Sequence, residues 1–178
     1  MTSQLRSLKR LINPVKEVDW EAVYAEQLPL VYNYFRYRVG DGPEAEDLTA
    51  ITFEKAWKQR RRYRCDLAAF STWIFAIARN SAIDHFRQKR ETLSLEAVAS
   101  LVGDESPEAT VQQRGEMARL NALLSGLPER ERELVALKYG AGLTNRNIAQ
   151  QTGLSETNVG TILSRVVQRL RAEWEMEP

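Results

Sequence analysis

The chain carries the segment LTNRNIAQQTGLS at residues 143–155. Within it, the small Ala149 lets two helices cross at close range, and Gly153 allows the tight turn between them. Ser155 can cap the helix that follows through its hydroxyl group. This layout predicts a helix-turn-helix, in which two short helices are separated by Thr152 and Gly153.

The helix after this turn has one apolar and one polar side. At the α-helical period the apolar residues fall together and must pack inward; they are Val159, Ile162, Leu163, Val166 and Leu170. The opposite side presents Thr157, Thr161, Ser164, Arg165 and Gln168, with Asn158 and Arg171 at its edges. Such side chains can read base edges in a major groove or hold phosphates. An ordinary helix with a solvated polar face is the alternative, and the preceding helix and turn favour DNA.

Helical periodicity also dominates the first half of the chain. Residues 20–35 form one apolar stripe, which Asp19 could cap and Gly40 could end, while Pro29 should bend the helix or mark a join. A second helix opens at a proline with acids in its first turn, and a third covers about residues 70–90. Their interlocking apolar stripes predict a small bundle.

Between the two helical sets the pattern weakens. Residues 94–107 are small and acidic and include Gly103 and Pro107, which is typical of a tether. Further helices are expected at about residues 108–124 and from Pro128 onward. The expected fold is therefore all-α, with two small helical domains joined by a flexible linker. The boundaries we predict are 1–18 for a basic N-terminal arm, 19–92 for the first domain, 93–112 for the linker and 113–178 for the second domain.

Charge is segregated along the chain, although the formal net charge is only +1. Residues 51–64 contain Glu54 as the only acid among several lysines and arginines, whereas residues 91–133 are rich in glutamate. This pattern suits a protein that touches a polyanion in some places and avoids it in others. In the first domain, arginines interleave with Tyr63, and Asn80 follows on the next helix, an arrangement that can hold phosphates and meet unstacked bases. The alternative is that the charges are solvated and the aromatics fill the core, which we favour for Trp73.

Several classes of protein are disfavoured by the residues present. Cys65 is the only cysteine and His85 the only histidine, so an internal disulfide or a Cys/His zinc cluster cannot be built. We find no Gly-rich phosphate loop, metal-ligand cluster or nucleophile motif, and we expect no catalytic residues, metal or cofactor. No window approaches the roughly 18 apolar residues of a membrane-spanning helix, and no signal peptide is evident. A cytoplasmic protein without membrane insertion is expected.

Two groups of motifs resemble one known family. AEDL at residues 45–48 with Phe53 and Trp57, TWIFAIARN at 72–80 and DHFR at 84–87 resemble region 2 of extracytoplasmic-function sigma factors of the sigma-70 family. LPERERE at residues 127–133, NIA at 147–149 and the helix from Asn158 to Arg165 resemble region 4. The resemblance spans about residues 19–174, and two motifs in the family's order are more specific than either alone.

The resemblance implies a role for each candidate residue. Core RNA polymerase would be bound by Asp47, Leu48, Phe53 and Trp57. The minus-ten element would be recognised and melted by Arg64, Phe70, Arg79, Asn80, Asp84 and Arg87, with Asn80 near a flipped base. The minus-thirty-five element would be bound by Arg146, Thr157, Asn158, Thr161, Ser164, Arg165 and Gln168.

The implied function is a non-catalytic initiation subunit that binds bacterial core RNA polymerase and promoter DNA, with an anti-sigma factor as the usual family partner. The sequence departs from the family at Gly160, Ile162 and Val167, where basic residues are common, so fewer phosphate contacts are expected there. Residues 49–52 also lack the usual Gln-Glu pair, which affects the detail of polymerase docking. The main alternative is a DNA-binding regulator with an N-terminal sensing or dimerising domain. Such a regulator would bind specific DNA without polymerase.

Overall fold

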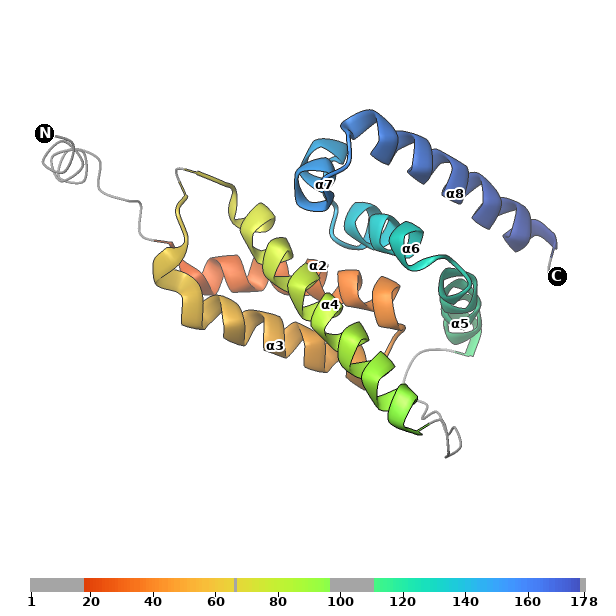
Figure 1. Cartoon of the computed structure of the whole chain (residues 1–178), viewed down its shortest axis with the longest axis horizontal. Coiled ribbons are helices and arrows are strands. Elements are labelled where there is room, and N and C mark those ends of the chain that lie inside the picture. Colours follow the sequence, from red (N-terminus) through yellow and green to blue (C-terminus); the bar gives the residue numbers. More distant parts are fainter. Residues whose placement is uncertain (1–17, 66, 97–110, 177–178) are drawn as a thin grey trace, which may run out of the picture.

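The computed structural model describes residues 18–65, 67–96 and 111–176, and within these ranges it contains helices and turns but no strand. The helices form two adjoining groups along the chain, as Figure 1 shows. One group consists of α2, α3 and α4, and the other of α5 to α8. The all-α architecture with two helical domains is therefore confirmed.

The first domain begins with α2 (Trp20–Val39), whose ends are set by the two residues expected from the sequence. Asp19 Oδ1 accepts a hydrogen bond from the Ala22 amide at 3.1 Å, and Gly40 ends the helix at a φ of 98°. The helix is continuous through Pro29, so the join that we considered there does not exist. It is followed by α3 (Pro43–Gln59), the short 3₁₀ turn η1 (Arg60–Arg62) and the long α4 (Phe70–Glu96).

The second domain contains α5 (Val111–Ser125), α6 (Glu129–Val135), the π-helical turn η2 (Ala136–Gly140), α7 (Asn145–Thr152) and α8 (Glu156–Met176). With 21 residues, α8 is longer than the short helix expected from the sequence. The predicted linker overlaps helix at both ends, because α4 runs through residue 96 and α5 begins at residue 111. Residues 97–110 of that linker and residues 1–17 of the predicted arm lie outside the described residues.

The helix-turn-helix is present at the predicted place. Thr144 Oγ1 accepts from the Asn147 amide at 3.2 Å and caps α7. Gly153 ends α7 with a φ of 73°, a left-handed conformation that glycine adopts without steric cost. Ser155 Oγ then accepts from the Asn158 amide at 3.2 Å at the start of α8. Local side-chain chemistry thus fixes the turn that orients α8.

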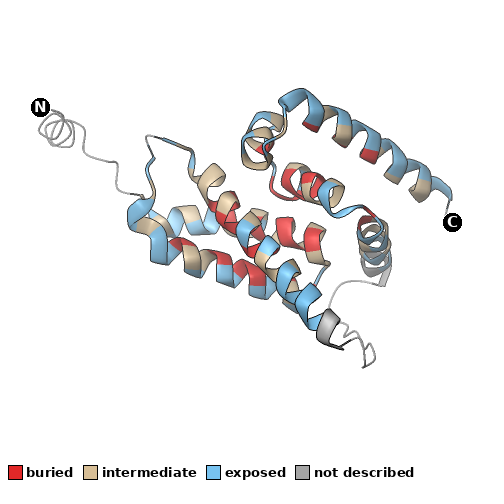
Figure 2. Ribbon diagram, in the orientation of Figure 1, coloured by how far each residue is buried: buried red, intermediate tan, exposed pale blue. Residues whose placement is uncertain are grey.

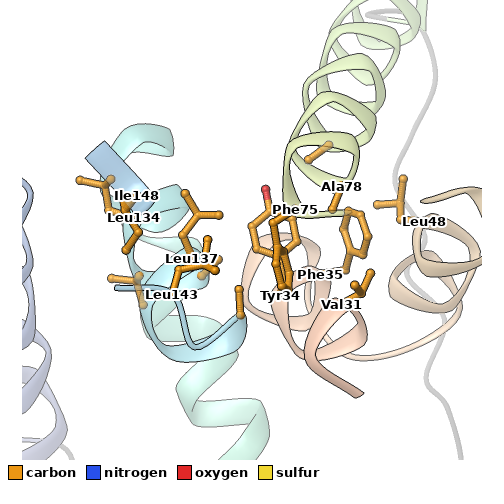
Figure 3. Packing of buried hydrophobic residues seen from close by; sticks show 14 of the residues in the cluster. Val31, Tyr34, Phe35, Leu48, Phe75, Ala78, Leu134, Leu137, Leu143 and Ile148 are labelled. Atoms are coloured by element: carbon orange, nitrogen blue, oxygen red, sulfur yellow. The ribbon is translucent and has the colours of Figure 1, made fainter. Parts of the chain in front are cut away.

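Both domains have apolar interiors, and the interiors meet (Figures 2 and 3). Val31 and Phe35 are fully buried in the first domain, and Leu134 and Ile148 are fully buried in the second. Tyr34 and Leu137, also fully buried, lie between these two groups of side chains (Figure 3). The two predicted domains are therefore in contact through a continuous core, which the sequence did not predict.

Candidate nucleic-acid interface

The outward side of α8 gathers most residues predicted to bind the upstream promoter element. Thr157, Thr161, Ser164, Arg165 and Gln168 line one open groove together with Gly160. All five are exposed, whereas Val159, Leu163 and Val166 on the opposite side of the helix are buried. The predicted division of α8 into an inward apolar and an outward polar side is confirmed.

The remaining two predicted residues flank this groove. Asn158 is exposed beside it, and Arg146 is exposed on α7 with its Nε 3.6 Å from a carboxylate oxygen of Glu156. Gly160 lies where the two helices of the motif approach each other, because a Cβ there would be 3.4 Å from Asn145 Nδ2. This is ordinary van der Waals contact with a flexible side chain, so the packing of α7 does not by itself require a glycine at this position.

A carboxylate on α6 already pairs with arginines of α8. Glu131, whose side chain is only 14% exposed, accepts from Arg165 at 3.1 Å and from Arg169 at 2.7 Å. The guanidinium group of Arg165 itself stays largely open to solvent. Glu131 therefore orients Arg165 and reduces the positive charge that α8 offers to DNA.

The residues predicted to bind the minus-ten element do not all lie together. Asn80 and Arg87 are exposed on α4, and Asp84 on the same side of the helix pairs with Arg87 at 3.3 Å and with Lys55 at 3.7 Å. Arg79 points elsewhere: its Nε donates to Glu133 Oε1 of α6 at 2.8 Å. The structure thus brings Asn80, Asp84 and Arg87 together and sets Arg79 apart from them.

The loop before α4 holds the other two minus-ten candidates. Arg64 is exposed in this loop. Phe70 packs in an aromatic cluster, with ring centroids 5.3 Å from both Tyr63 and Trp73 and 5.6 Å from Trp20. The partial burial of Trp73 in this cluster agrees with the core role favoured for it.

The residues predicted to bind polymerase lie on two sides of α3. Asp47 is exposed, Trp57 is 52% exposed, and Phe53 packs edge-on against Tyr24 at 4.6 Å. Leu48 is different, because it lies in the core at 4% exposure. Leu48 therefore supports α3 from within and offers no surface to a partner in this conformation.

Sequence reasoning missed the acids of α6. Glu129, Glu131 and Glu133 all engage arginines of other helices, whereas the sequence showed only that residues 91–133 are rich in glutamate. A signal existed: residues four apart share one face of a helix, so Glu129 and Glu133 point to one side while Glu131 points away from them. That spacing distinguishes acids that face the first domain from an acid that faces α8.

Burial and hydrogen bonding also raise the pKa values of two tyrosines. Burial raises the pKa of Tyr34 to about 12. Burial together with the hydrogen bond to Asp41 raises the pKa of Tyr32 to about 12.

Within the described residues, no group of three His, Cys, Asp or Glu side chains could hold a metal ion. No helix in the same part of the chain has the length and apolar character needed to cross a membrane.

Comparison with known proteins agrees with this architecture. The model of sigma-70 region 2 matches residues 23–92, and that of sigma-70 region 4 matches residues 117–170. The ECF RNA polymerase sigma factor SigF of Caulobacter vibrioides is 30% identical over 178 residues, which cover 96% of this chain and 95% of that protein. BldN of Streptomyces coelicolor, another ECF sigma factor, is 32% identical over 151 residues, which cover 83% of this chain but 57% of that protein.

A solved structure shares the fold. It is the sigma factor RpoE in complex with the anti-sigma factor NepR, from Bartonella quintana, with a TM-score of 0.75 and 19% identity over 90% of this chain and 99% of that chain. Both sigma-70 regions occur in order, each on one of the helical domains described above. The chain therefore belongs to the extracytoplasmic-function sigma factors, the subunits that direct RNA polymerase to promoters and initiate transcription there.

Proposed function

We propose that this chain binds core RNA polymerase through α3 and divides promoter recognition between its domains. Residues 19–92 would recognise and melt the minus-ten element, and residues 113–178 would bind the minus-thirty-five element. The chain would act in the cytoplasm as a non-catalytic subunit, with the polymerase supplying the chemistry. The observation that carries the proposal is the outward polar side of α8, held in position by a helix-turn-helix.

The upstream contact is supported by the character of that side. Hydroxyl and amide groups of Thr157, Thr161 and Gln168 can donate and accept hydrogen bonds at base edges in a major groove. Arg165 and Arg146 can reach phosphates, although each already faces a carboxylate of its own domain. Because these carboxylates offset the two arginines, the outward side of α8 carries little net positive charge. We therefore expect modest affinity for upstream DNA in the absence of polymerase.

The downstream contact is supported by α4 and its preceding loop. Asn80 is exposed between the aromatic cluster at the start of α4 and the basic side chain of Arg87. An exposed amide can hydrogen-bond an unstacked base, and an exposed arginine suits the neighbouring phosphates. Binding by two weak modules on one polymerase gains affinity from effective concentration, so neither module needs to bind tightly alone.

The polymerase contact is supported by exposed aromatic surface on α3. Trp57 remains 52% exposed while its ring lies 4.0 Å from the guanidinium carbon of Arg60 and 5.9 Å from the ring of Trp20. Large, partly buried aromatics of this kind are enriched at the centres of protein interfaces.

We also propose an anti-sigma factor as a partner, since the structurally similar RpoE was solved with the anti-sigma factor NepR.

Run-off transcription with purified core polymerase tests the proposal. The template would be a library with randomised minus-ten and minus-thirty-five blocks, and the transcripts would be sequenced. The wild-type chain should select a pair of sequence blocks, Arg165→Ala should lose selection upstream, and Asn80→Ala should lose opening at the minus-ten block. Arg130→Ala, which removes an exposed arginine from α6, is the matched control and should behave as wild type. Specific DNA binding without core, combined with no initiation when core is present, would identify a simple regulator instead.

A further inference from the structure

Lys55 of α3 belongs to none of the predicted binding surfaces, yet its side chain reaches the residues of α4 that are expected to read the minus-ten element. Its Nζ donates to Ser81 Oγ at 3.1 Å and lies 3.7 Å from Asp84 Oδ2. We propose that Lys55 is a positioning residue for promoter reading: together with Arg87 it holds the Asp84 carboxylate, which accepts a hydrogen bond from the amino group of an unstacked base. This inference rests on the proposed function.

The direction of the Lys55 side chain follows from its place on α3. Lys55 and Trp57 are two residues apart, and such positions point about 200° apart around a helix. Trp57 is half exposed on the side proposed to contact polymerase, whereas Lys55 turns toward α4 and is hydrogen-bonded there. One helix therefore presents a different side to each of the two partners.

A buried hydroxyl group anchors the lysine. Ser81 is only 2% exposed and accepts the hydrogen bond from Lys55. An ammonium group on a four-carbon stem moves freely in water, so a fixed acceptor restricts its positions. At 3.7 Å from Asp84 the ammonium forms an ion pair and not a hydrogen bond. Lys55 therefore sets the charge around the carboxylate and leaves its lone pairs open to another donor.

Asp84 is held between two cations. Its Oδ1 lies 3.3 Å from a guanidinium nitrogen of Arg87, and the Asp84 side chain remains 46% exposed. A carboxylate without such partners would be repelled by DNA, because like charges that face each other across an interface cost free energy. With one cation beside each carboxylate oxygen, the three side chains together are positive. DNA can therefore approach Asp84 closely.

The chemistry of a carboxylate decides what it can bind. Ionised Asp84 only accepts hydrogen bonds, so its partner cannot be a phosphate oxygen but can be an amino group of a base. Cytosine N4 is such a group and a common partner of carboxylates in DNA recognition, whereas thymine carries no amino group. Asn80 lies one helical turn before Asp84 on the same face of α4. Both side chains would therefore meet the same stretch of opened DNA.

A purely structural role of these contacts is the alternative. Half-exposed ion pairs add little to stability, because water screens them and ordering the side chains costs entropy. Loss of the Lys55 charge should therefore leave the melting temperature of the chain almost unchanged. The effect should appear in the choice of base, which a mere brace between α3 and α4 would not alter.

Competition between two templates measures the choice of base. Both templates carry the minus-ten block that the wild-type chain with core polymerase selects from the promoter library, opened by mismatches so that its bases are unpaired. In one template a selected base loses its amino group: pyrimidin-2-one replaces cytosine, purine replaces adenine, or hypoxanthine replaces guanine. Each base of the block that has an amino group is tested in turn. The templates give transcripts of different length, and the ratio of the two transcripts is the measured preference.

The carboxylate is tested first. At one position the wild-type chain should prefer the template with the amino group on the order of tenfold, which is the discrimination of one good base contact. Asp84→Ala should bring the ratio at this position close to one, because the acceptor is gone. Glu91→Ala removes an exposed acid from the same helix and is the matched control, which should keep the wild-type ratio.

The lysine is tested at the same position. Lys55→Gln should lower the preference several-fold with little change in melting temperature, and Lys55→Arg, which keeps the positive charge, should restore it. Lys58→Gln removes the same charge from α3 at a lysine that pairs with Glu54 of its own helix. This matched control should keep the wild-type ratio.

The outcomes separate the inference from the function on which it rests. A wild-type preference that survives in both Asp84→Ala and Lys55→Gln, or the lack of any position at which the amino group matters, would overturn the inference and leave the sigma activity standing. A lower melting temperature of Lys55→Gln with an unchanged ratio would make Lys55 a structural brace only. If the wild-type chain with core polymerase initiates on no member of the promoter library, the proposed function itself fails, before any modified base is used.

Discussion

The guanidinium of Arg165 lies 3.1 Å from the carboxylate of Glu131, so an arginine that lines the α8 groove is held in place by α6. The other carboxylate oxygen binds Arg169 at 2.7 Å. One carboxylate thus restrains two cations on the helix proposed to enter DNA. If α8 binds DNA as proposed, Glu131 would control that contact through the two arginines it pairs with.

Glu131→Gln should make DNA binding by the full chain tighter and less selective, because two arginines lose their intramolecular anion. At low salt the affinity for random duplex should rise several-fold, and the slope of log K against log salt should steepen by about 0.9 for each arginine that gains a phosphate. Anisotropy titrations over a salt series measure both quantities. Glu175→Gln, at an exposed position near the end of α8, is the control for loss of one negative charge. An unchanged salt slope would show that Glu131 does not restrain these arginines.

The sequence predicted those parts of the fold that depend on local chemistry. Asp19, Gly153 and Ser155 each satisfy backbone groups within a few residues, so their roles can be read from neighbours in the chain. The polar side of α8 could be predicted for the same reason, since helical periodicity alone separates it from the apolar side.

The sequence could not predict what depends on contact between distant segments. The need for glycine at Gly140 comes from the backbone of Asn33 in the other domain, and nothing around residue 140 reveals it. Similarly, Arg79 and Asn80 are neighbours in the motif, but consecutive residues on a helix point about 100° apart. Only the packed structure shows that one faces Glu133 and the other faces solvent.

Gly153→Ala should destabilise the helix-turn-helix by about 1 kcal/mol, because an alanine at a φ of 73° is strained. Gly153→Asn should cost less, since asparagine tolerates the left-handed region better than alanine. Amide hydrogen exchange of α7 and α8 measures the loss locally. Gly126→Ala serves as the comparison, and equal protection in the Gly153→Ala and Gly126→Ala variants would contradict the assignment.

Alkaline pH should lower the free energy of unfolding, because the buried phenol of Tyr34 resists ionisation. Its pKa is raised by burial to about 12, above the value of about 10 in an unfolded chain. Above pH 10 the unfolded chain therefore loses a proton that the folded chain keeps, and stability falls between about pH 10 and 12 by about 2–3 kcal/mol. Tyr32, shifted in the same direction, contributes with the same sign.

Urea unfolding at pH 9 and pH 11 tests this dependence. Tyr34→Phe should lose less stability between the two values than the wild type, because it has no phenol to ionise in the core. Tyr24→Phe, which alters a tyrosine that is 48% exposed, should keep the wild-type dependence. An identical loss in all three proteins would show that the Tyr34 phenol does not govern the alkaline limit.

Ile148 links the turn of the helix-turn-helix to the core, because it is fully buried on α7 between the capping residue and the glycine turn. Ile148→Ala should lower the free energy of unfolding by about 2–5 kcal/mol through lost burial and the cavity left behind. Met176→Ala, at a position 78% exposed near the end of α8, should change it by less than about 0.5 kcal/mol. Since α7 also carries Gln151, whose side-chain amide donates to the Thr72 carbonyl of α4 at 3.3 Å, the core variant should also lower the amide hydrogen-exchange protection of α7. Urea unfolding measures the change, and equal free energies of unfolding for the Ile148→Ala and Met176→Ala variants would show that Ile148 does not hold α7 in the core.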